Sequence, residues 1–376
     1  MPLTSETHAS TVPLLDLKRE YAAIAAEIQQ AWVRALSTMH LLKGENVAAF
    51  EREIAAYIGV PYACGAASGT DALLLGLLSL GIGAGDEIIV HANAFVAAVE
   101  AVHHAGAQPV LVDVEVDGLG PDADAVANAV SPRTRAIMVT HMYGSPLALS
   151  RIEALATRQG LVIIEDGSHA HGASRGGRKV GTFGTLGCFS AGVVKNLGAY
   201  GDAGFITTAD ADLAQRLRLL GAHGQEHKNA HVVYGFNSRL DELQAAVLRV
   251  KLRYLEARNH RRQEIATYYR QRFSGLDVRV PLEQPGEVHV YHQFVIRMAQ
   301  RERLQAHLKV AGIETGVHYP VPLHRQPAWL RRYGESPPLP RAERLAREVL
   351  SLPVFPDLTD TEIERVANAV AAFFGA

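Results

Sequence analysis

Short apolar runs rich in β-branched residues alternate with helical patterns between residues 71 and 166. The candidate strands are DEIIVHA (86–92), QPVLVDV (108–114), RAIMVTHM (135–142) and GLVIIED (160–166). The candidate helices are DALLLGLLSLG (71–81), FVAAVEAVHHAG (95–106), ADAVANAV (123–130) and LSRIEALATRQG (149–160). Strands that are buried on both faces read as continuous hydrophobic runs, and strands that alternate with helices run parallel. The alternation therefore predicts an α/β fold with a mainly parallel sheet between helices.

This alternation breaks around Lys195. Two further candidate strands, LGCFSA (186–191) and GFITT (204–208), follow one another with no room for a helix between them. A long helical stretch over 239–273 then leads away from the sheet, and the pattern from residue 278 onward predicts a smaller α+β domain. We expect a large domain with an N-terminal arm over 1–255 and a small C-terminal domain over 256–376.

The composition narrows the class of protein. The chain has 376 residues, of which 48% are hydrophobic, enough for a large core and more than one domain. A net charge of −2 gives no basic surface for nucleic acid or an anionic membrane. Two cysteines, Cys64 and Cys188, are too few for a disulfide framework, and no signal peptide or membrane-spanning run is evident. We expect a cytoplasmic protein without a metal site that binds neither nucleic acid nor membrane.

Four features fall at the carboxyl ends of the predicted strands, where open α/β sheets bind ligands. Asp166 ends one strand and Ser190 lies at the end of another. The segment ASGTDALLLG (67–76) is a turn of small residues that opens a helix, and its free N–H groups and positive dipole end suit a phosphate. Lys195 stands on a glycine-bounded loop five residues after Ser190.

A phosphate cradle, a carboxylate and a lysine together suit pyridoxal phosphate. The lysine amine would form an imine with the cofactor aldehyde, and the carboxylate would keep the pyridine nitrogen protonated so that the ring accepts electrons. Each element alone has a plainer interpretation. A strand-ending Asp is often a turn residue, SGT before a helix is often an N-cap, and a lone lysine is usually solvated. Their joint order indicates the cofactor site.

Six motifs spread over nearly the whole chain carry a family resemblance. They are LLKGENVAAFEREIAAYIGV, SGTDAL, EDGSHAHGA, CFSAGVVKNLGAYGDAG, NSRLDELQAAVLRVKL and GVHYPVPLH. With them the chain resembles the sugar aminotransferases of the DegT/DnrJ/EryC1/StrS family, which are fold-type I enzymes that use pyridoxal phosphate. The resemblance implies a seven-stranded sheet and a homodimer with shared active sites.

The resemblance also implies a role for each matching residue. Lys195 would carry the cofactor as an imine, and Asp166 would pair with the pyridine nitrogen. The residues implied for the phosphate are Gly69, Thr70 and Ser190. Phe95 would stack on the cofactor ring, and Asn237 would reach the phosphate of the neighbouring subunit.

The chain departs from the family pattern at three places. His169 stands where glutamine is usual, and an imidazole could donate the same hydrogen bond to the phenolic oxygen of the cofactor. This change resembles the cyclitol and aminobenzoate branches, although a structural histidine that bonds a loop carbonyl is the alternative. The segment AGVV (191–194) lacks the usual FYP, and Ala203 replaces a frequent glycine. These departures concern the placement of the substrate rather than the cofactor chemistry.

Three functions remain open at this point. The favoured one moves an amino group from L-glutamate or L-glutamine to C3 of a dTDP-3-keto-6-deoxyhexose, with Lys195 as the proton shuttle and His318 and Tyr319 near the sugar. The preference for C3 comes from the segments 234–252 and 316–324. A second function is amination of a keto-cyclitol or of a C4 keto-sugar. The third is a protein of this fold without transfer activity, which the retained lysine argues against, as it argues against the related dehydratases.

Overall fold

The structure, a computed structural model, describes residues 11–116 and 119–375. Residues 1–10, where the expected N-terminal arm begins and half of the segment tested for a signal peptide lies, fall outside the described residues. Within the described residues, no helix combines the length and the apolar character that a membrane crossing requires.

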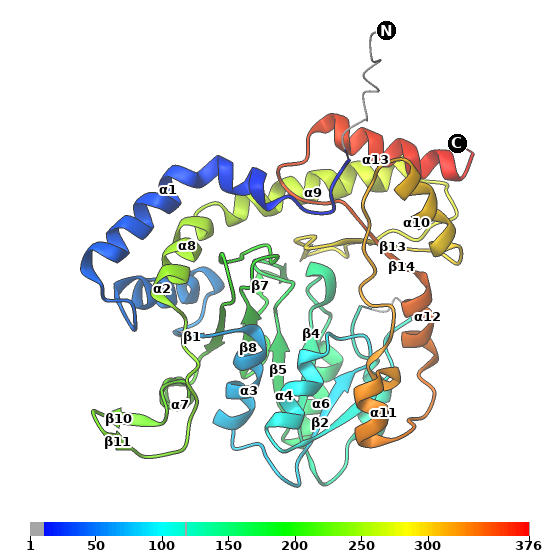
Figure 1. The fold of residues 1–376 in the computed structure, drawn as a ribbon. Coiled ribbons are helices and arrows are strands. Elements are labelled where there is room, and N and C mark those ends of the chain that lie inside the picture. The colour runs from blue at the N-terminus through cyan, green and yellow to red at the C-terminus, as the bar shows by residue number, and fades with distance from the viewer. Residues whose placement is uncertain (1–10, 117–118, 376) are drawn as a thin grey trace.

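A seven-stranded sheet forms the centre of the molecule (Figure 1). Its strands in spatial order are β1 (Tyr62–Ala66), β9 (Gly204–Thr208), β8 (Leu186–Ser190), β5 (Val162–Asp166), β4 (Thr134–Thr140), β2 (Glu87–His91) and β3 (Gln108–Val112). All pairings from β8 to β3 are parallel, whereas β9 is antiparallel to both of its neighbours. Because β8 and β9 have no helix between them, their antiparallel pairing follows from the break in the sequence alternation. Six of these strands match predicted ones, and β1 was not predicted.

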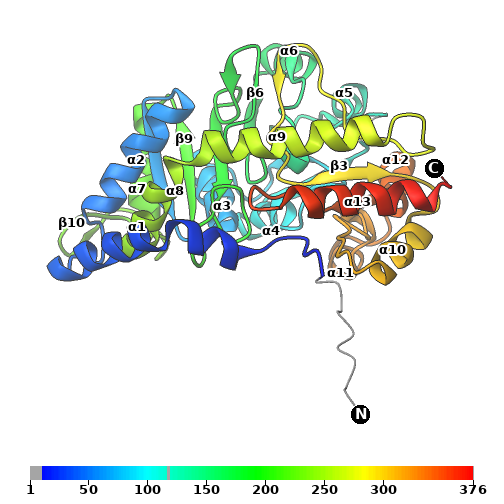
Figure 2. The same ribbon diagram turned by 90° about the horizontal axis from the view of Figure 1, so that it is seen from above.

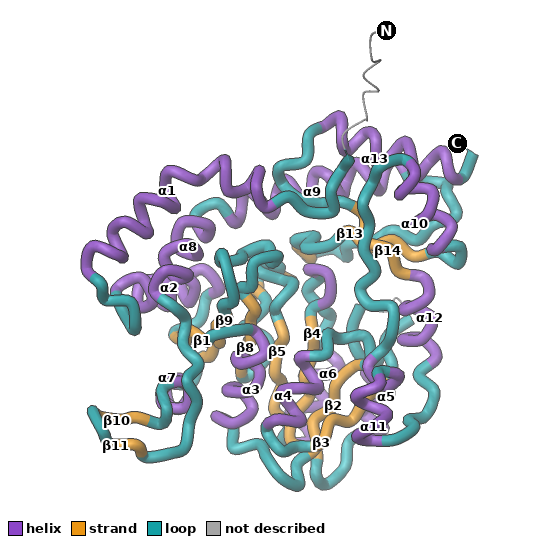
Figure 3. The backbone as a smooth tube through the Cα atoms, in the orientation of Figure 1, coloured by secondary structure: helices purple, strands orange, loops and turns teal. Residues whose placement is uncertain are grey.

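Helices cover both faces of the sheet. Ile88 and Val90 of β2 pack with α3 (Gly69–Ser79), α4 (Ala97–His104) and α7 (Ala211–Gly221). The intervening Ile89 packs on the opposite face with α5 (Ala123–Ala129) and α6 (Ser150–Gln159). On that same face Phe189 of β8 packs with α2 (Glu45–Ile58) and α8 (Glu242–Leu252). The sheet is therefore buried on both sides, as its continuous apolar strands predict, and Figure 3 shows these helices around it.

The helical stretch predicted over 239–273 is two helices instead of one. Helix α8 ends at Leu252, and α9 (Leu255–Arg272) begins after Arg253 and Tyr254. The side chains of both intervening residues hydrogen-bond Glu27 of α1 (Leu17–Thr38). The interruption lets α8 pack on α1 and α2 while α9 crosses to the C-terminal part of the chain (Figures 1 and 2).

The C-terminal part of the chain has its own hydrophobic core. Its elements are β13 (Phe294–Arg297), α10 (Arg301–Val310), η2 (Leu323–Arg325), α11 (Pro327–Tyr333), α12 (Pro340–Glu348), β14 (Val349–Leu352) and α13 (Asp360–Phe373). Strands β13 and β14 pair antiparallel, and Tyr269 of α9 packs against Phe294 with ring centroids 5.2 Å apart. Helices α9 and α13 run side by side in both views of the molecule (Figures 1 and 2). This arrangement is the smaller α+β part that the sequence predicts.

Two smaller sheets and one short helix complete the structure. Strands β6 (Ser174–Arg175), β7 (Arg178–Lys179) and β12 (Glu287–Val288) form a three-stranded sheet. Strands β10 (Gln225–His227) and β11 (Ala230–His231) form a hairpin that projects from the body of the molecule (Figure 1). The short helix η1 (Met142–Gly144) follows β4.

Candidate active site

Asp166 lies at the carboxyl end of β5, between the ends of two parallel neighbours. In the strand register it stands opposite Thr140 of β4 and Cys188 of β8. The residue is 3% exposed, and its carboxylate accepts hydrogen bonds from the Thr140 hydroxyl at 3.3 Å and from the Ser168 N–H at 3.1 Å. These donors hold the carboxylate in place, and its two oxygens keep acceptor capacity for a further partner.

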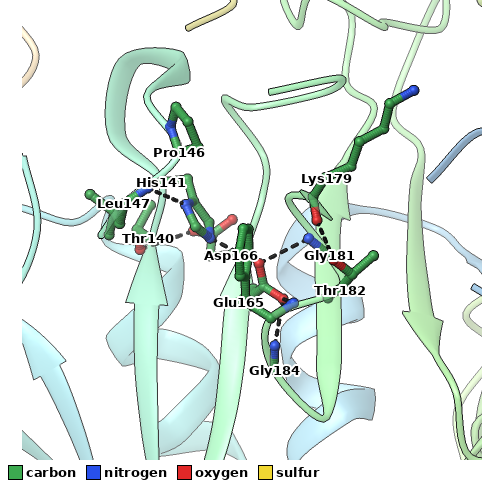
Figure 4. Close-up of polar contacts among 12 residues, drawn as sticks. Thr140, His141, Pro146, Leu147, Glu165, Asp166, Lys179, Gly181, Thr182 and Gly184 are labelled. Atoms are coloured by element: carbon green, nitrogen blue, oxygen red, sulfur yellow. Dashed lines mark hydrogen bonds and ion pairs between the residues drawn. The ribbon is translucent and has the colours of Figure 1, made fainter. Parts of the chain in front are cut away.

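The preceding residue, Glu165, has a different function, because successive side chains of a strand point to opposite faces. Its carboxylate accepts hydrogen bonds from three backbone N–H groups and contacts one imidazole (Figure 4). The groups are the N–H of Gly181 at 2.9 Å, of Phe183 at 2.7 Å and of Gly184 at 2.7 Å, and His141 Nε2 at 3.0 Å. Glu165 therefore ties the loop before β8 to β5, and Asp166 is the carboxylate left for a ligand.

The start of α3 packs against the end of β8. Ser68 caps the helix by accepting the Asp71 N–H at 3.1 Å. The N–H groups of Gly69 and Thr70 in the first turn have no hydrogen-bond acceptor among the described residues. A Cβ added at Gly69 would lie 2.4 Å from the Cβ of Ser190. Two free N–H groups, a helix dipole and a serine hydroxyl thus meet where a phosphate would be held.

Lys195 lies on the loop between β8 and β9, where its N–H donates to the Gly192 carbonyl at 2.9 Å. The next residue, Asn196, anchors the loop: its oxygen contacts His171 Nδ1 at 2.9 Å and its amide donates to Asn259 at 3.0 Å. Burial lowers the pKa of Lys195 to about 8, against the opposing effect of the negative charge of Asp166. A large fraction of the amine is therefore neutral and nucleophilic near pH 8.

His169 is 2% exposed and lies beside the Lys195 loop. Its Nδ1 accepts the Tyr143 N–H at 3.4 Å, and its ring packs against that of His292 with centroids 4.7 Å apart and the planes tilted by 35°. Burial, and then the positive charge of Lys195, lower the pKa of His169 well below its ordinary value. The ring is therefore neutral and keeps its hydrogen on Nε2, which is a donor. The alternative interpretation of His169 was a structural histidine that bonds a loop carbonyl. The hydrogen bond seen at Nδ1 comes instead from a loop N–H, that of Tyr143.

The C-terminal segment brings His318 and Tyr319 to the same region. The His318 carbonyl accepts the Tyr143 hydroxyl at 2.6 Å, and His318 Nδ1 contacts Ser351 Oγ at 2.8 Å. Burial and the charge of Lys195 lower the pKa of His318 to about 4. Burial and the charge of Asp166 raise the pKa of Tyr319, whose ring lies 5.5 Å from the half-exposed ring of Phe95. His318 therefore lies within electrostatic reach of the lysine, and Tyr319 within reach of the aspartate.

Asn237 is a predicted site residue whose side chain is bonded outside this cluster. Its side chain is exposed, and its oxygen accepts a hydrogen bond from Arg239 at 2.6 Å. It follows a row of exposed apolar side chains after the projecting hairpin, among them Tyr234 and Phe236. Among the described residues of one chain, no side-chain hydrogen bond joins Asn237 to Lys195, Asp166 or Ser190.

Three residues at the site were not predicted. Tyr143 joins His169 to His318, Asn196 fixes the Lys195 loop, and His292 packs against His169. Asn196 directly follows the lysine in sequence, and this position could have identified it as a residue of the site. Tyr143 and His292 are separated by 149 positions and meet only in the fold, so no spacing in the sequence reveals them.

These residues fit pyridoxal phosphate. At the cradle, the absence of a side chain at Gly69 lets the start of α3 lie against Ser190, because a Cβ there would clash with the serine. Asp166 offers a fixed carboxylate, and Lys195 offers an amine of lowered pKa. His169 offers an Nε2–H donor. A phosphate, a pyridine nitrogen, an aldehyde and a phenolic oxygen each find a suitable group in this set.

Comparisons with known proteins agree with this fit. The family model of the DegT/DnrJ/EryC1/StrS aminotransferase family matches residues 22–371. A dTDP-3-amino-3,4,6-trideoxy-alpha-D-glucose transaminase of Streptomyces venezuelae is 43% identical, covering 98% of this chain and 97% of that protein. A UDP-N-acetyl-3-dehydro-alpha-D-glucosamine 3-aminotransferase of Acidithiobacillus ferrooxidans is 41% identical, covering 97% and 98%.

A solved structure shares the whole fold. The crystal structure of S. venezuelae DesV in complex with a ketimine intermediate superposes with a TM-score of 0.95 at 43% identity, covering 98% of this chain and 99% of that one. The predicted fold class, enzyme class and cofactor are confirmed by these likenesses. The chain therefore belongs to the DegT/DnrJ/EryC1/StrS aminotransferase family, whose enzymes depend on pyridoxal phosphate.

Proposed function

We propose that this aminotransferase moves an amino group from L-glutamate or L-glutamine to C3 of a dTDP-3-keto-6-deoxyhexose. The observation that carries the chemistry is Lys195, whose amine of lowered pKa stands beside Asp166 at the carboxyl edge of the sheet. The choice of C3 is supported by the two relatives above, whose names both place the amino group at that carbon. The choice of dTDP is supported by the Streptomyces relative.

The residues of the site divide the work of this reaction. When bound, pyridoxal phosphate supplies an aldehyde for amines and a ring that takes up the electron pair released at the reacting carbon. Asp166 holds the proton on the pyridine nitrogen, and His169 donates from Nε2 to the phenolic oxygen. Lys195 Nζ removes a proton from the reacting carbon of the donor and returns one to the reacting carbon of the sugar.

The phosphate anchors this arrangement. The N–H groups of Gly69 and Thr70 and the hydroxyl of Ser190 bind the phosphate, and Phe95 packs on the cofactor ring. His318 and Tyr319 lie on the C-terminal side and orient the sugar, so that its carbonyl meets the reacting amine at near-attack distance. If the sugar ring were bound one carbon further along, C4 would be aminated in place of C3.

The test separates the two halves of the reaction. Purified enzyme is aminated with L-glutamate, freed of the amino acid, and offered matched 3-keto and 4-keto nucleotide sugars and a keto-inositol. We expect the 3-keto sugar to return the cofactor absorbance to the aldehyde form and to yield a 3-amino sugar by NMR. Turnover of the cyclitol alone would overturn the proposal and support the alternative that His169 suggests. An amine at C4 would also overturn the proposal, because it shows that the other keto-sugar is the substrate. Lys195→Ala protein is the control without transfer.

We also propose that two copies of the chain form a homodimer with shared active sites. The exposed apolar row after the β10–β11 hairpin supports this, because such a patch on a projecting arm is typical of a protein interface. Asn237 follows this row and would reach the phosphate of the partner. Mixing Lys195→Ala and Asn237→Ala proteins should then restore activity, since one of the two sites in a heterodimer carries neither change. No recovery despite demonstrated subunit exchange would argue against sharing.

We further propose that the two expected domains, 1–255 and 256–376, are units of the active protein. Support comes from the separate hydrophobic core around Tyr269 and Phe294 and from the position of the boundary, at the first residue of α9. Lys195 belongs to the first unit and His318 to the second, so the active site lies where the two units meet.

A further inference from the structure

A cavity of about 240 Å³ lies between the Lys195 loop and the C-terminal part of the chain. The residues of its wall that matter here are Val194, Arg262, His292, Gln293, His318 and Ser351. We call this cavity the Arg262 pocket. Of these residues only His318 has a role in the function proposed above, so most of the wall is not assigned to the cofactor or to the sugar.

Three buried polar atoms in the wall of the Arg262 pocket have no hydrogen-bond partner among the described residues. They are Arg262 Nε, His292 Nδ1 and Gln293 Oε1. Buried polar groups in folded proteins are nearly always paired with protein, water or a ligand. Three such atoms on one wall therefore point to a polar molecule that completes their hydrogen bonds.

Arg262 differs in its partners from three other arginines of α9. Arg258, Arg261 and Arg270 form ion pairs with Asp357 at 3.3 Å, Asp360 at 2.6 Å and Glu283 at 2.6 Å. Arg262 is only 6% exposed, and its Nη1 donates to the carbonyl oxygens of Tyr291 and Val354.

No carboxylate pairs with Arg262 within the ranges that the structure describes. The two acidic groups whose charges act on it, Glu20 and Asp357, are engaged by Lys251 at 2.6 Å and by Arg258 at 3.3 Å. Burying a cation without an anionic partner costs free energy. A carboxylate that binds beside Arg262 would reduce this cost.

The Arg262 pocket lies close to the reacting amine. Arg262 and Lys195 together line a small adjoining cavity, and Val194 borders both cavities. The positive charge of Lys195 also contributes to the lowered pKa values of His292 and His318. A molecule in the pocket would therefore stand next to the lysine, which is where the amino-acid donor must place its amine.

We propose that the Arg262 pocket binds a carboxylate of the amino-acid donor, with the guanidinium as counter-ion and His292 and Gln293 as hydrogen-bonding neighbours. This inference rests on the proposed function, since it assigns the donor of that reaction to a site. Both candidate donors carry a carboxylate on the reacting carbon. Arginine suits this group because its N–H donors match the two carboxylate oxygens.

The diphosphate of the nucleotide sugar is the other anion in the reaction. The Arg262 pocket, at about 240 Å³, is smaller than sites for drug-sized ligands, which occupy about 300–1,000 Å³. It has room for an amino acid, whereas a nucleotide sugar would extend well beyond it. The size therefore favours the donor, and the experiment includes both anions.

The experiment compares Arg262→Gln with wild-type enzyme in each half-reaction. For the variant we expect the concentration of L-glutamate that half-saturates amination of the cofactor to rise on the order of 10- to 100-fold. The half-saturating concentration of the keto-sugar in the return reaction should stay within about threefold of the wild-type value. A change at one site has little effect on a second site with which it shares no contacts. Arg261→Gln, on the same helix and paired with exposed Asp360, is the matched control and should change neither value.

Binding of a non-reacting dicarboxylate gives a readout that needs no turnover. Calorimetry should show that glutarate binds wild-type holoenzyme and binds Arg262→Gln more weakly. The dimethyl ester of glutarate, which has no carboxylate, should not bind wild-type holoenzyme. Gln293→Leu, which leaves the carbonyl contacts of Arg262 in place, should also weaken glutarate and serves if Arg262→Gln fails to fold. Equal glutarate affinity in wild type and both variants would overturn the proposal, as would weakened binding of dTDP with glutarate unchanged.

Two further outcomes are distinguishable. A purely structural role of Arg262 predicts a lower melting temperature together with equal loss in both half-reactions, which would overturn the donor site. If the aminated enzyme accepts no nucleotide keto-sugar while amination by glutamate still depends on Arg262, the proposed function fails and the donor site stands.

Discussion

Gly69, the first residue of α3, lies so close to Ser190, the last residue of β8, that a Cβ at position 69 would come within 2.4 Å of the Ser190 Cβ and 2.8 Å of its Cα. The contact is between a helix start and a strand end, neither of which can move without disturbing the sheet. The glycine therefore sets the distance between the free N–H groups of the helix and the serine hydroxyl, which is the width of the proposed phosphate cradle.

Gly69→Ala should widen this cradle and weaken cofactor binding. The added methyl group cannot be accommodated without a backbone shift, so we expect the apoenzyme to lose about 1–3 kcal/mol of unfolding free energy. The dissociation constant of pyridoxal phosphate should rise about tenfold or more, because phosphate contacts are lost. Urea unfolding and spectrophotometric titration measure the two effects. Gly83→Ala is the control, since a Cβ there lies at 3.6 Å from the Ala105 carbonyl; an unchanged cofactor affinity in Gly69→Ala would contradict the cradle.

The capture of cofactor by apoenzyme should depend on pH through Lys195. Its amine is nucleophilic only when neutral, and burial lowers its pKa from 10.5 to about 8. The rate of capture, followed by absorbance, should therefore rise with pH with a midpoint near 8. In Asp166→Asn the midpoint should fall below that of wild type, because the charge of Asp166 raises the pKa of the lysine.

Borohydride treatment of the loaded enzyme identifies the amine. The pyridoxyl label should appear on the peptide that contains Lys195, and Lys195→Ala should take up no label. A label on another lysine, or a capture midpoint near 10.5, would show that the buried amine is not the one that reacts.

Substitution of His169 should separate hydrogen bonding from charge. Because the Tyr143 N–H occupies Nδ1, the neutral ring offers Nε2–H to the cofactor. His169→Gln retains a donor and should keep kcat within about fivefold, whereas His169→Leu should lose on the order of 10²-fold. The pKa of His169 lies well below 6.5, so the acid limb of the pH–rate profile should be the same in wild type and His169→Gln. A limb near pH 6 that vanishes in His169→Gln would contradict a neutral histidine.

The sheet and the cofactor residues were predictable because each carries a local signal. Buried parallel strands are continuous apolar runs, and Asp166 and Ser190 stand at the ends of two of them. Strand β1 escaped prediction because YACGA has no β-branched residue and pairs only through partners over 130 positions away. The break between α8 and α9 at Tyr254 was not predicted, because the sequence there contains no glycine or proline. The break depends on the contact of Tyr254 with Glu27 of α1.

The Arg262 pocket could not be predicted from the sequence for a different reason. What distinguishes Arg262 is that its side chain is buried without a carboxylate partner, and this depends on which acidic side chains the fold places beside α9. Arg258 and Arg261 look the same as Arg262 in the sequence, but they pair with Asp357, just before α13, and with Asp360, the first residue of α13. Which of several charged residues is left unpaired is a property of the tertiary structure alone.

The N-terminal and C-terminal helices are joined by an ion pair whose strength should depend on pH. Arg19 of α1 binds Glu362 of α13 at 2.7 Å, and this hydrogen bond lowers the pKa of Glu362 from 4.5 to about 2. A carboxylate whose pKa is lower in the folded state stabilises the fold at every pH above its unfolded value. The contribution should therefore be complete above about pH 4.5 and should disappear as the pH falls towards 2.

Glu362→Gln should cost about 1 kcal/mol at pH 7, a value kept small because the guanidinium of Arg19 is partly exposed and screened. Glutamine at this position can still complete the capping box with Thr359, so the substitution removes the charge and retains the cap. Glu364→Gln, an exposed change of equal charge on the same helix, is the control and should be neutral. Urea unfolding at pH 7 and at successively lower pH measures the difference between the two variants. A difference that stays constant from pH 7 to pH 3 would show that Glu362 contributes through packing or capping and not through its pairing with Arg19.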